Sequence, residues 1–158
     1  TEITFFEPDS NHLKTTSISY GVINFKEKVQ IYGEDFVRKK IITHFSQFYN
    51  ENKSLSEKFV SIGSCSTMTT LCSVFQNLPF YNPSQIEGFE MSREQVINTI
   101  NYINKLSVSD LKTHPCIKEK YKLLKSGIEI LLFIIKVFPI KKIITTHKGL
   151  RDAIIDEL

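Results

Sequence analysis

The sequence predicts an α/β fold in which helices flank a mixed sheet. The chain opens with two strand-like runs separated by a turn, which favours an antiparallel hairpin. Two later runs rich in β-branched residues, at 58–62 and 143–146, are separated by helical patterns. Strands connected through helices pair in parallel, so the two kinds of pairing together give a mixed sheet. A length of 158 residues suits one domain, which we expect to span 1–158.

The hairpin is predicted from the first residues onward. The run Thr1–Glu7 is rich in β-branched and aromatic residues and predicts a strand. Pro8–Asn11 predicts a turn, and His12–Tyr20 a second strand that ends at Gly21. Because the first strand begins without a lead-in or an initiator Met, we expect the chain to be a piece of a longer protein.

Two helices are predicted after the hairpin. Asn24 followed by Glu27 is typical of a capping box at a helix start. A longer helix should follow Gly33. Apolar side chains fall roughly on one face of this longer helix, namely Phe36, Val37, Ile41, Phe45 and Phe48.

The middle of the chain predicts a strand followed by helices. Lys58–Ile62 predicts a strand that runs into small residues at 63–67, and Met68–Leu78 then predicts a helix. Ser92 with Gln95 predicts a second capping box. The helix that it opens would carry Val96, Ile97, Ile100 and Ile103 on one face.

The last part of the chain is the most apolar. Ile117–Phe138 predicts a buried helix that Pro139 ends, followed by a strand at Ile143–Thr146 and a helix at Gly149–Leu158. The apolar run Ile130–Ile135 is far shorter than the roughly 20 residues that cross a bilayer. We therefore expect no membrane partner.

Composition indicates a globular protein with reduced thiols. Apolar residues make up 41% of the chain and charged residues 23%. Cys65, Cys72 and Cys116 are odd in number and show no paired spacing, which favours a cytoplasmic protein over a disulfide framework. The net charge of +3 does not imply nucleic acid as a partner. The lysines that become frequent from Lys112 onward suit either a polyanion or a solvated helix face.

The strand-to-helix turn at residues 62–67 is the best candidate for chemistry. Its small residues would let backbone amides and hydroxyls approach an anion, although such turns also serve packing alone. No arginine follows Cys65 to clamp a phosphate, so this thiol is interpreted as a packing residue. The four histidines are scattered without ligand spacing, so a zinc site is not expected.

Motifs along nearly the whole chain resemble those of the Ppx/GppA phosphatases. Thr1-Glu2 resembles the end of that family's first glycine-rich loop in this lobe, and Ile62–Leu71 aligns with its second phosphate loop. Further matches follow in the expected order, namely Gly21 and Glu27, Tyr81–Pro83, Gly88–Glu94, Leu106–Ser107 and Gly149–Asp152.

The resemblance implies the C-terminal lobe of an actin/hexokinase-like (ribonuclease H-like) fold, lacking its first strand. In this family a water molecule attacks a terminal phosphoryl group of polyphosphate or guanosine pentaphosphate, and Mg²⁺ neutralises the developing charge. Glu2 matches a position near the metal, and the loop that faces the phosphates is matched by Gly63, Ser64, Ser66 and Thr67. The general base is expected on a missing N-terminal lobe. No catalytic residue is therefore assigned to this chain, which should be inactive alone.

The sequence also departs from the family's pattern. Cys65-Ser66 replaces a Gly-Gly pair, and each replacement would cost about 1 kcal/mol or more if those positions need positive φ. Glu87 replaces a histidine, and Thr146-His147 replaces Ser-Asp. Lys120–Lys122 replaces Arg-Ala-Asp, and lysine lacks the bidentate fork of arginine.

Two functions therefore remain open. The first is part of a magnesium-dependent phosphoanhydride hydrolase that acts on polyphosphate or guanosine pentaphosphate. The alternative is a non-catalytic module that binds polyphosphate or a nucleotide, or that mediates formation of a homodimer. The absent strand would leave the edge of Thr1–Phe6 unpaired, so we expect self-association through this edge or its covering by another chain.

Overall fold

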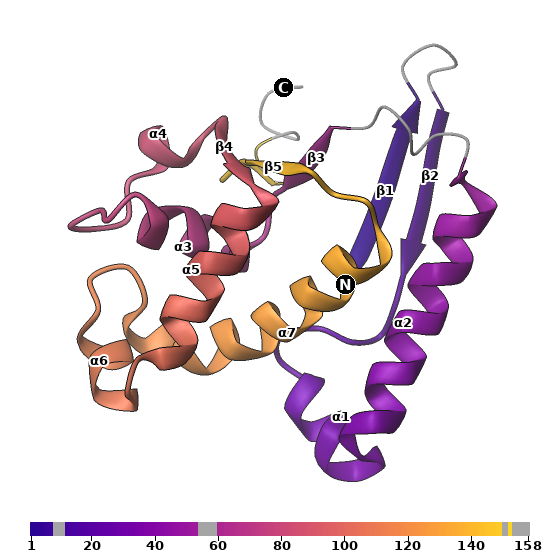
Figure 1. Cartoon of the computed structure of the whole chain (residues 1–158), viewed down its shortest axis with the longest axis horizontal. Coiled ribbons are helices and arrows are strands. Elements are labelled where there is room, and N and C mark those ends of the chain that lie inside the picture. The colour runs from indigo at the N-terminus through magenta and orange to yellow at the C-terminus, as the bar shows by residue number, and fades with distance from the viewer. Residues whose placement is uncertain (8–11, 54–59, 150–151, 153–158) are drawn as a thin grey trace. The chain divides into compact units, whose positions relative to one another are not determined.

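The structure, a computed structural model, describes residues 1–7, 12–53, 60–149 and 152 (Figure 1). The chain divides into two compact units. The first unit comprises Thr1–Phe59 with Lys125–Pro139, and the second comprises Val60–Leu124 with Ile140–Leu158. The predicted turn at 8–11 and all but two residues of the predicted final helix lie outside the described residues.

The first unit begins with the predicted hairpin. Strand β1 (Glu2–Glu7) pairs antiparallel with β2 (His12–Ser17) in a two-stranded sheet. The register sets Glu2 opposite Ser17 and Glu7 opposite His12. The hairpin prediction is thus confirmed, with a second strand shorter than expected.

The outer edge of β1 is turned away from β2. The Ile18 amide donates to the Thr1 carbonyl at 2.9 Å, so these two residues form a hydrogen-bonded pair. Hydrogen-bonded and non-hydrogen-bonded pairs alternate along an antiparallel ladder, so the main-chain N–H and C=O groups of Glu2, Thr4 and Phe6 point away from β2. No second strand pairs with β1 among the residues that the structure describes. Self-association through this edge stays a prediction.

Two helices follow the hairpin, α1 (Phe25–Tyr32) and α2 (Glu34–Glu51). The capping box predicted at Asn24 is wrong, because the Asn24 side chain accepts from the Gly21 amide at 2.9 Å and stabilises the preceding turn instead. Four of the five predicted core residues of α2 are buried, namely Val37, Ile41, Phe45 and Phe48. Phe36 was predicted on the same face, but it is 47% exposed.

Aromatic rings form the centre of the first unit. The ring of Phe138 lies 5.9 Å from Phe5, 6.2 Å from Phe45 and 5.6 Å from Tyr49. Phe5 of β1 also stacks on Phe48 of α2 at 5.2 Å. On the second strand, Thr16 shares a 2.6 Å hydrogen bond with His44 of α2. These contacts hold the hairpin against α2, beside which it runs in Figure 1.

The second unit contains the mixed sheet. Its strand order is β3-β5-β4, with β5 (Lys142–Thr145) parallel to β3 (Ser61–Gly63) and antiparallel to β4 (Phe89–Ser92). The parallel pairing and the presence of a mixed sheet are confirmed, but the hairpin forms a sheet of its own, and the antiparallel strand of the mixed sheet is β4. Strand β4 was not predicted, because its few residues show no long alternation of apolar and polar side chains.

Four helices of the second unit follow β3 in the chain, and all except the first begin with a side-chain cap. These helices are α3 (Ser66–Phe75), α4 (Pro83–Ile86), α5 (Arg93–Lys105) and α6 (Val108–Thr113). The predicted capping box at Ser92 and Gln95 is present at the start of α5. On α5, Val96, Ile100 and Ile103 are buried as predicted, whereas Ile97 is half-buried.

The most apolar helix starts later than the sequence predicts. A 3₁₀ turn, η2 (Lys118–Lys120), precedes α7 (Tyr121–Val137). Lys118 has φ of 48°, a left-handed conformation that does not continue a right-handed helix. No helix within the described ranges is long and apolar enough to cross a membrane.

Candidate functional site

The predicted phosphate turn connects β3 to α3. Ser64 follows the last strand residue, Gly63, and Cys65 is the N-cap of the helix. Ser64, Cys65 and Ser66 are exposed, whereas Thr67 is buried. The turn therefore presents two serine side chains and the start of a helix at the carboxyl end of a parallel strand, where ligands of open α/β sheets commonly bind.

The first amides of α3 have no acceptor among the residues that the structure describes. Cys65 makes no side-chain cap, and the first amide bonded to its carbonyl is that of Thr69, at 3.1 Å. Within the described part, the N–H groups of Ser66, Thr67 and Met68 make no hydrogen bond. By contrast, side-chain oxygens of Asn82, Ser92 and Ser107 cap α4, α5 and α6. Unsatisfied amides at the positive end of a helix can bind an anion.

Packing explains the glycine at the start of the turn. A Cβ atom on Gly63 would lie 2.6 Å from Cγ of Met68 and 3.2 Å from Cγ2 of Ile143. Gly63 does not have positive φ. Its hydrogen side chain lets β3 lie close to both α3 and β5, which fixes where the turn leaves the sheet.

Cys65 and Ser66 need no unusual backbone. Cys65 has φ −95° and ψ 160°, an extended conformation, and Ser66 is the first residue of α3. Among the described non-glycine residues, positive φ occurs only at Asn77 and Lys118. The strain considered for the Cys65-Ser66 replacement is therefore absent.

A carboxylate-imidazole pair lies at the end of β5, and sequence reasoning had not joined its members. Glu87 Oε2 is 2.8 Å from Nδ1 of His147 and accepts the His147 main-chain amide at 3.0 Å. The Thr146 hydroxyl lies 2.9 Å from both oxygens of Glu87. The His147 amide and the Thr146 hydroxyl hold the pKa of Glu87 below its ordinary value.

Hydrogen bonds connect this pair to the candidate turn. Gly63 lies opposite Thr145 in the parallel register, and the Thr146 amide donates to the Gly63 carbonyl at 3.1 Å. The Gly88 amide, next to Glu87, donates to the Thr145 carbonyl at 2.9 Å. The residues that follow β3 and β5 therefore leave the sheet side by side.

Solved structures with the same fold cover almost all of this chain. One is a crystal structure of the Aquifex aeolicus Ppx/GppA phosphatase in its type II variant, with 17% identity and a TM-score of 0.76, covering 99% of this chain and 52% of that one. Another crystal structure of the Aquifex aeolicus family member has 17% identity and a TM-score of 0.71 over 99% and 51%. An exopolyphosphatase-like protein has 12% identity and a TM-score of 0.76 over 99% and 55%. No protein-family model and no curated protein matches the sequence.

The chain has the fold of about half of a Ppx/GppA phosphatase. The resemblance predicted from the motifs is thus confirmed as a likeness of fold. The chain spans about half the length of the structures that it matches.

The departures from the Ppx/GppA pattern at Glu87 and His147 are not independent. Each had been noted separately, as an acid in place of a histidine and a histidine in place of an acid. The structure pairs them at 2.8 Å, so the two departures meet in one contact of this chain. The charge of Glu87 is thereby directed at His147 and Thr146.

The predicted metal position belongs to the other compact unit. Glu2 is exposed at the start of β1, so its role near a metal stays a prediction. Within the described ranges, no group of three or more His, Cys, Asp or Glu side chains could hold a metal ion. Mg²⁺ is often held by one or two carboxylates together with substrate phosphates. A single exposed carboxylate such as Glu2 fits this kind of coordination.

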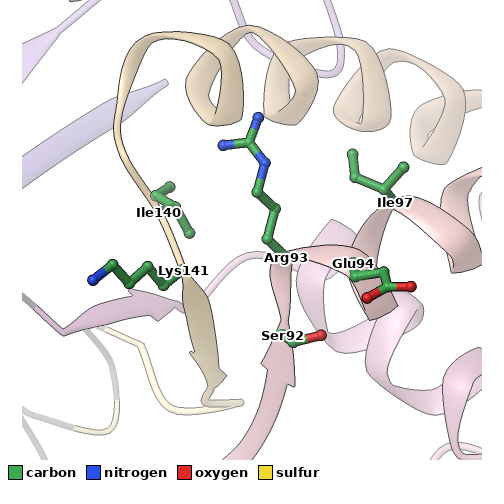
Figure 2. Close-up of a pocket in the computed structure, with 6 residues that line it drawn as sticks. All are labelled: Ser92, Arg93, Glu94, Ile97, Ile140 and Lys141. Atoms are coloured by element: carbon green, nitrogen blue, oxygen red, sulfur yellow. The ribbon is translucent and has the colours of Figure 1, made fainter.

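The motif Ser92–Glu94 lines a surface depression of about 530 Å³ in the second unit (Figure 2). Ile97, Ile140 and Lys141 complete its lining, and the Arg93 amide donates to the Lys141 carbonyl at 2.8 Å. Figure 2 shows the side chains of Arg93, Glu94 and Lys141 pointing in different directions. Because these charged groups do not converge, the depression is a weaker candidate for phosphate than the turn after β3.

Proposed function

We propose that this chain is the C-terminal lobe of a magnesium-dependent phosphoanhydride hydrolase. The proposed whole protein releases terminal phosphate from inorganic polyphosphate or guanosine pentaphosphate, and the lobe alone is inactive. The observation that carries the proposal is that the amides of Ser66, Thr67 and Met68 at the start of α3 make no hydrogen bond within the described residues. The likeness of fold to Ppx/GppA phosphatases over 99% of the chain supports it.

In this proposal the turn after β3 binds phosphate oxygens. The amides of α3 donate to the anion, and the exposed hydroxyls of Ser64 and Ser66 add donors beside them. Hydrogen-bond donors at a helix start next to a paired strand are already held in place, so the protein loses little conformational freedom when the anion binds. This chain contributes binding and orientation of the phosphates.

The proposed metal is Mg²⁺, with Glu2 as one oxygen ligand. When bound, the metal would neutralise charge on the phosphates. The general base is assigned to a second, N-terminal lobe, as the resemblance to the Ppx/GppA phosphatases implies. The actin/hexokinase-like assignment belongs to the same proposal.

The decisive experiment measures phosphate release in the presence of Mg²⁺. Polyphosphate and guanosine pentaphosphate are compared as substrates for the isolated chain and for the longer protein that carries it. We expect release by the longer protein only, and the faster substrate identifies the preference. If neither protein released phosphate, hydrolysis would be rejected and a binding or dimerisation module would be favoured.

A substitution in the longer protein tests the role of the turn. Ser64→Ala removes one exposed hydroxyl and should lower kcat/KM by about ten-fold or more, as expected for a lost hydrogen bond to a charged group. Ser109→Ala, on the exposed surface of α6, is the matched control and should leave kcat/KM unchanged. Equal activity of the two variants would remove the turn from the phosphate site.

A further inference from the structure

The pair of Glu87 and His147 has the geometry of an oriented imidazole. Both the ring Nδ1 and the main-chain amide of His147 point to the same oxygen of Glu87, at 2.8 and 3.0 Å. An ionised carboxylate only accepts hydrogen bonds, so Nδ1 carries a proton. The second ring nitrogen, Nε2, makes no hydrogen bond within the described part of the chain.

The pair also lies beside the turn after β3. The bond from the Thr146 amide to the Gly63 carbonyl extends the parallel pairing past the last ladder residues. Neighbouring strands are about 4.8 Å apart, so the residues that directly follow them leave the same edge within side-chain reach of one another. Ser64 and His147 are the residues that come next after this bond on the two strands.

We propose that His147 is an additional phosphate ligand, donating from Nε2 to an oxygen of an anion held at the turn. This inference rests on the proposed function of the turn as a phosphate site. In the imidazolium form both ring nitrogens carry a proton, so Nε2 can donate to the anion while Nδ1 stays bonded to Glu87. A cationic donor to phosphate makes a charge-assisted hydrogen bond. The Glu87 oxygens accept bonds from Thr146 and His147, and Glu87 precedes β4, which lies on the side of β5 away from β3.

Protonation controls this contact. In the neutral imidazole with its proton on Nδ1, Nε2 can accept a hydrogen bond but cannot donate one to phosphate. Among the described residues, the other titratable groups nearby are Glu87 on the segment before β4, Cys65 on the turn, and Lys148 and Asp152 on the loop after β5. His147 is the one imidazole among them. The anion also titrates, since a phosphate group has a second pKa of about 6, so the part of the pH dependence that His147→Gln removes is assigned to His147.

The test measures binding of tripolyphosphate to the full chain by titration calorimetry at about pH 6 and about pH 8. His147→Gln keeps a neutral N–H donor but removes the cation. It should weaken binding by about ten-fold or more at the lower pH and much less at the higher pH. His12→Gln is the matched control, because His12 is an exposed histidine on β2, in the other unit. This variant should bind like the unaltered chain at both values.

The outcomes separate the two proposals. No binding of tripolyphosphate by the unaltered chain at either pH would overturn both the turn and the ligand role of His147. Binding that His147→Gln leaves unchanged would overturn the role of His147 alone. NMR of the histidine ring nitrogens gives a readout that needs no variant. Tripolyphosphate should shift the Nε2 signal of His147 but not that of His12, and an unshifted His147 signal in the bound state would reject the contact.

Discussion

The two compact units complete their sheets in different ways. In the first unit a two-stranded hairpin leaves one edge of β1 without a strand partner among the described residues, and Phe6 and Leu13, a cross-strand pair, are 57% and 64% exposed. In the second unit β5 is paired on both sides. The candidate turn and the Glu87–His147 pair both leave this better-paired sheet. A site whose groups stand on paired strands needs no further element to position them.

The cores of the two units also differ in chemistry. Rings around Phe138 fill the first, whereas the second is mainly aliphatic, with Leu71, Met91, Ile100 and Ile103 fully buried. Because a few large rings pack around Phe138, the stability of the first unit depends strongly on this one residue. Many smaller side chains spread the same burial over more positions.

The largest effect is expected from Phe138→Ala, which removes the ring that three other rings surround. Phe138 is 3% exposed, so a large cavity should form, lowering the free energy of unfolding by about 3–5 kcal/mol. Urea unfolding followed by circular dichroism measures this loss. Phe36→Ala in the same unit removes a ring that is 47% exposed, and it should cost much less. Similar losses for the two variants would contradict a core centred on Phe138.

A smaller effect is expected from Gly63→Ala in the second unit. The new Cβ would lie 2.6 Å from Met68 Cγ and 3.2 Å from Ile143 Cγ2, so the start of α3 must move, at a cost of about 1–3 kcal/mol. Gly21→Ala is the control, because no atom lies within 4 Å of its added Cβ and Gly21 is not among the glycines with positive φ. Thermal unfolding of both variants decides the matter. If Gly63→Ala were as stable as Gly21→Ala, the inference that the turn is closely packed around Gly63 would be contradicted.

Local signals in the sequence predicted most of the fold. Capping at Ser92, the apolar face of α2 and the β-branched runs of β1 and β5 each depend on neighbouring residues, and they were predicted correctly apart from Phe36 on α2. The misses were short elements, such as β4, and Asn24, whose side chain had two possible partners. A short element shows too few periods for a pattern to be recognised.

The candidate site was predicted only in part, for a different reason. The small residues at 63–67 indicated a turn, and its position after β3 followed from the strand. The pairing of Glu87 with His147 joins residues far apart in the chain, through the register of β3, β5 and β4. Acidic and basic side chains at such separation give no local pattern, although their joint departure from the Ppx/GppA motifs was a usable signal.

The smallest expected effect concerns the pH dependence that Glu87 gives to the second unit. Hydrogen bonds from His147 and Thr146 place the folded-state pKa of Glu87 below its ordinary value of 4.5. The pair therefore stabilises the fold fully above that value, and this contribution is lost as the pH falls through the lowered folded pKa. Glu87→Gln should flatten the acid limb of thermal stability, modestly because the pair is 31% and 38% exposed. Glu119→Gln, an exposed residue without a hydrogen bond in the described part, should retain the full limb. If the thermal stability of Glu87→Gln and of the unaltered chain fell equally with pH in the acid range, the pair would contribute nothing to folding. The sheet alone would then hold the site of the second unit in place.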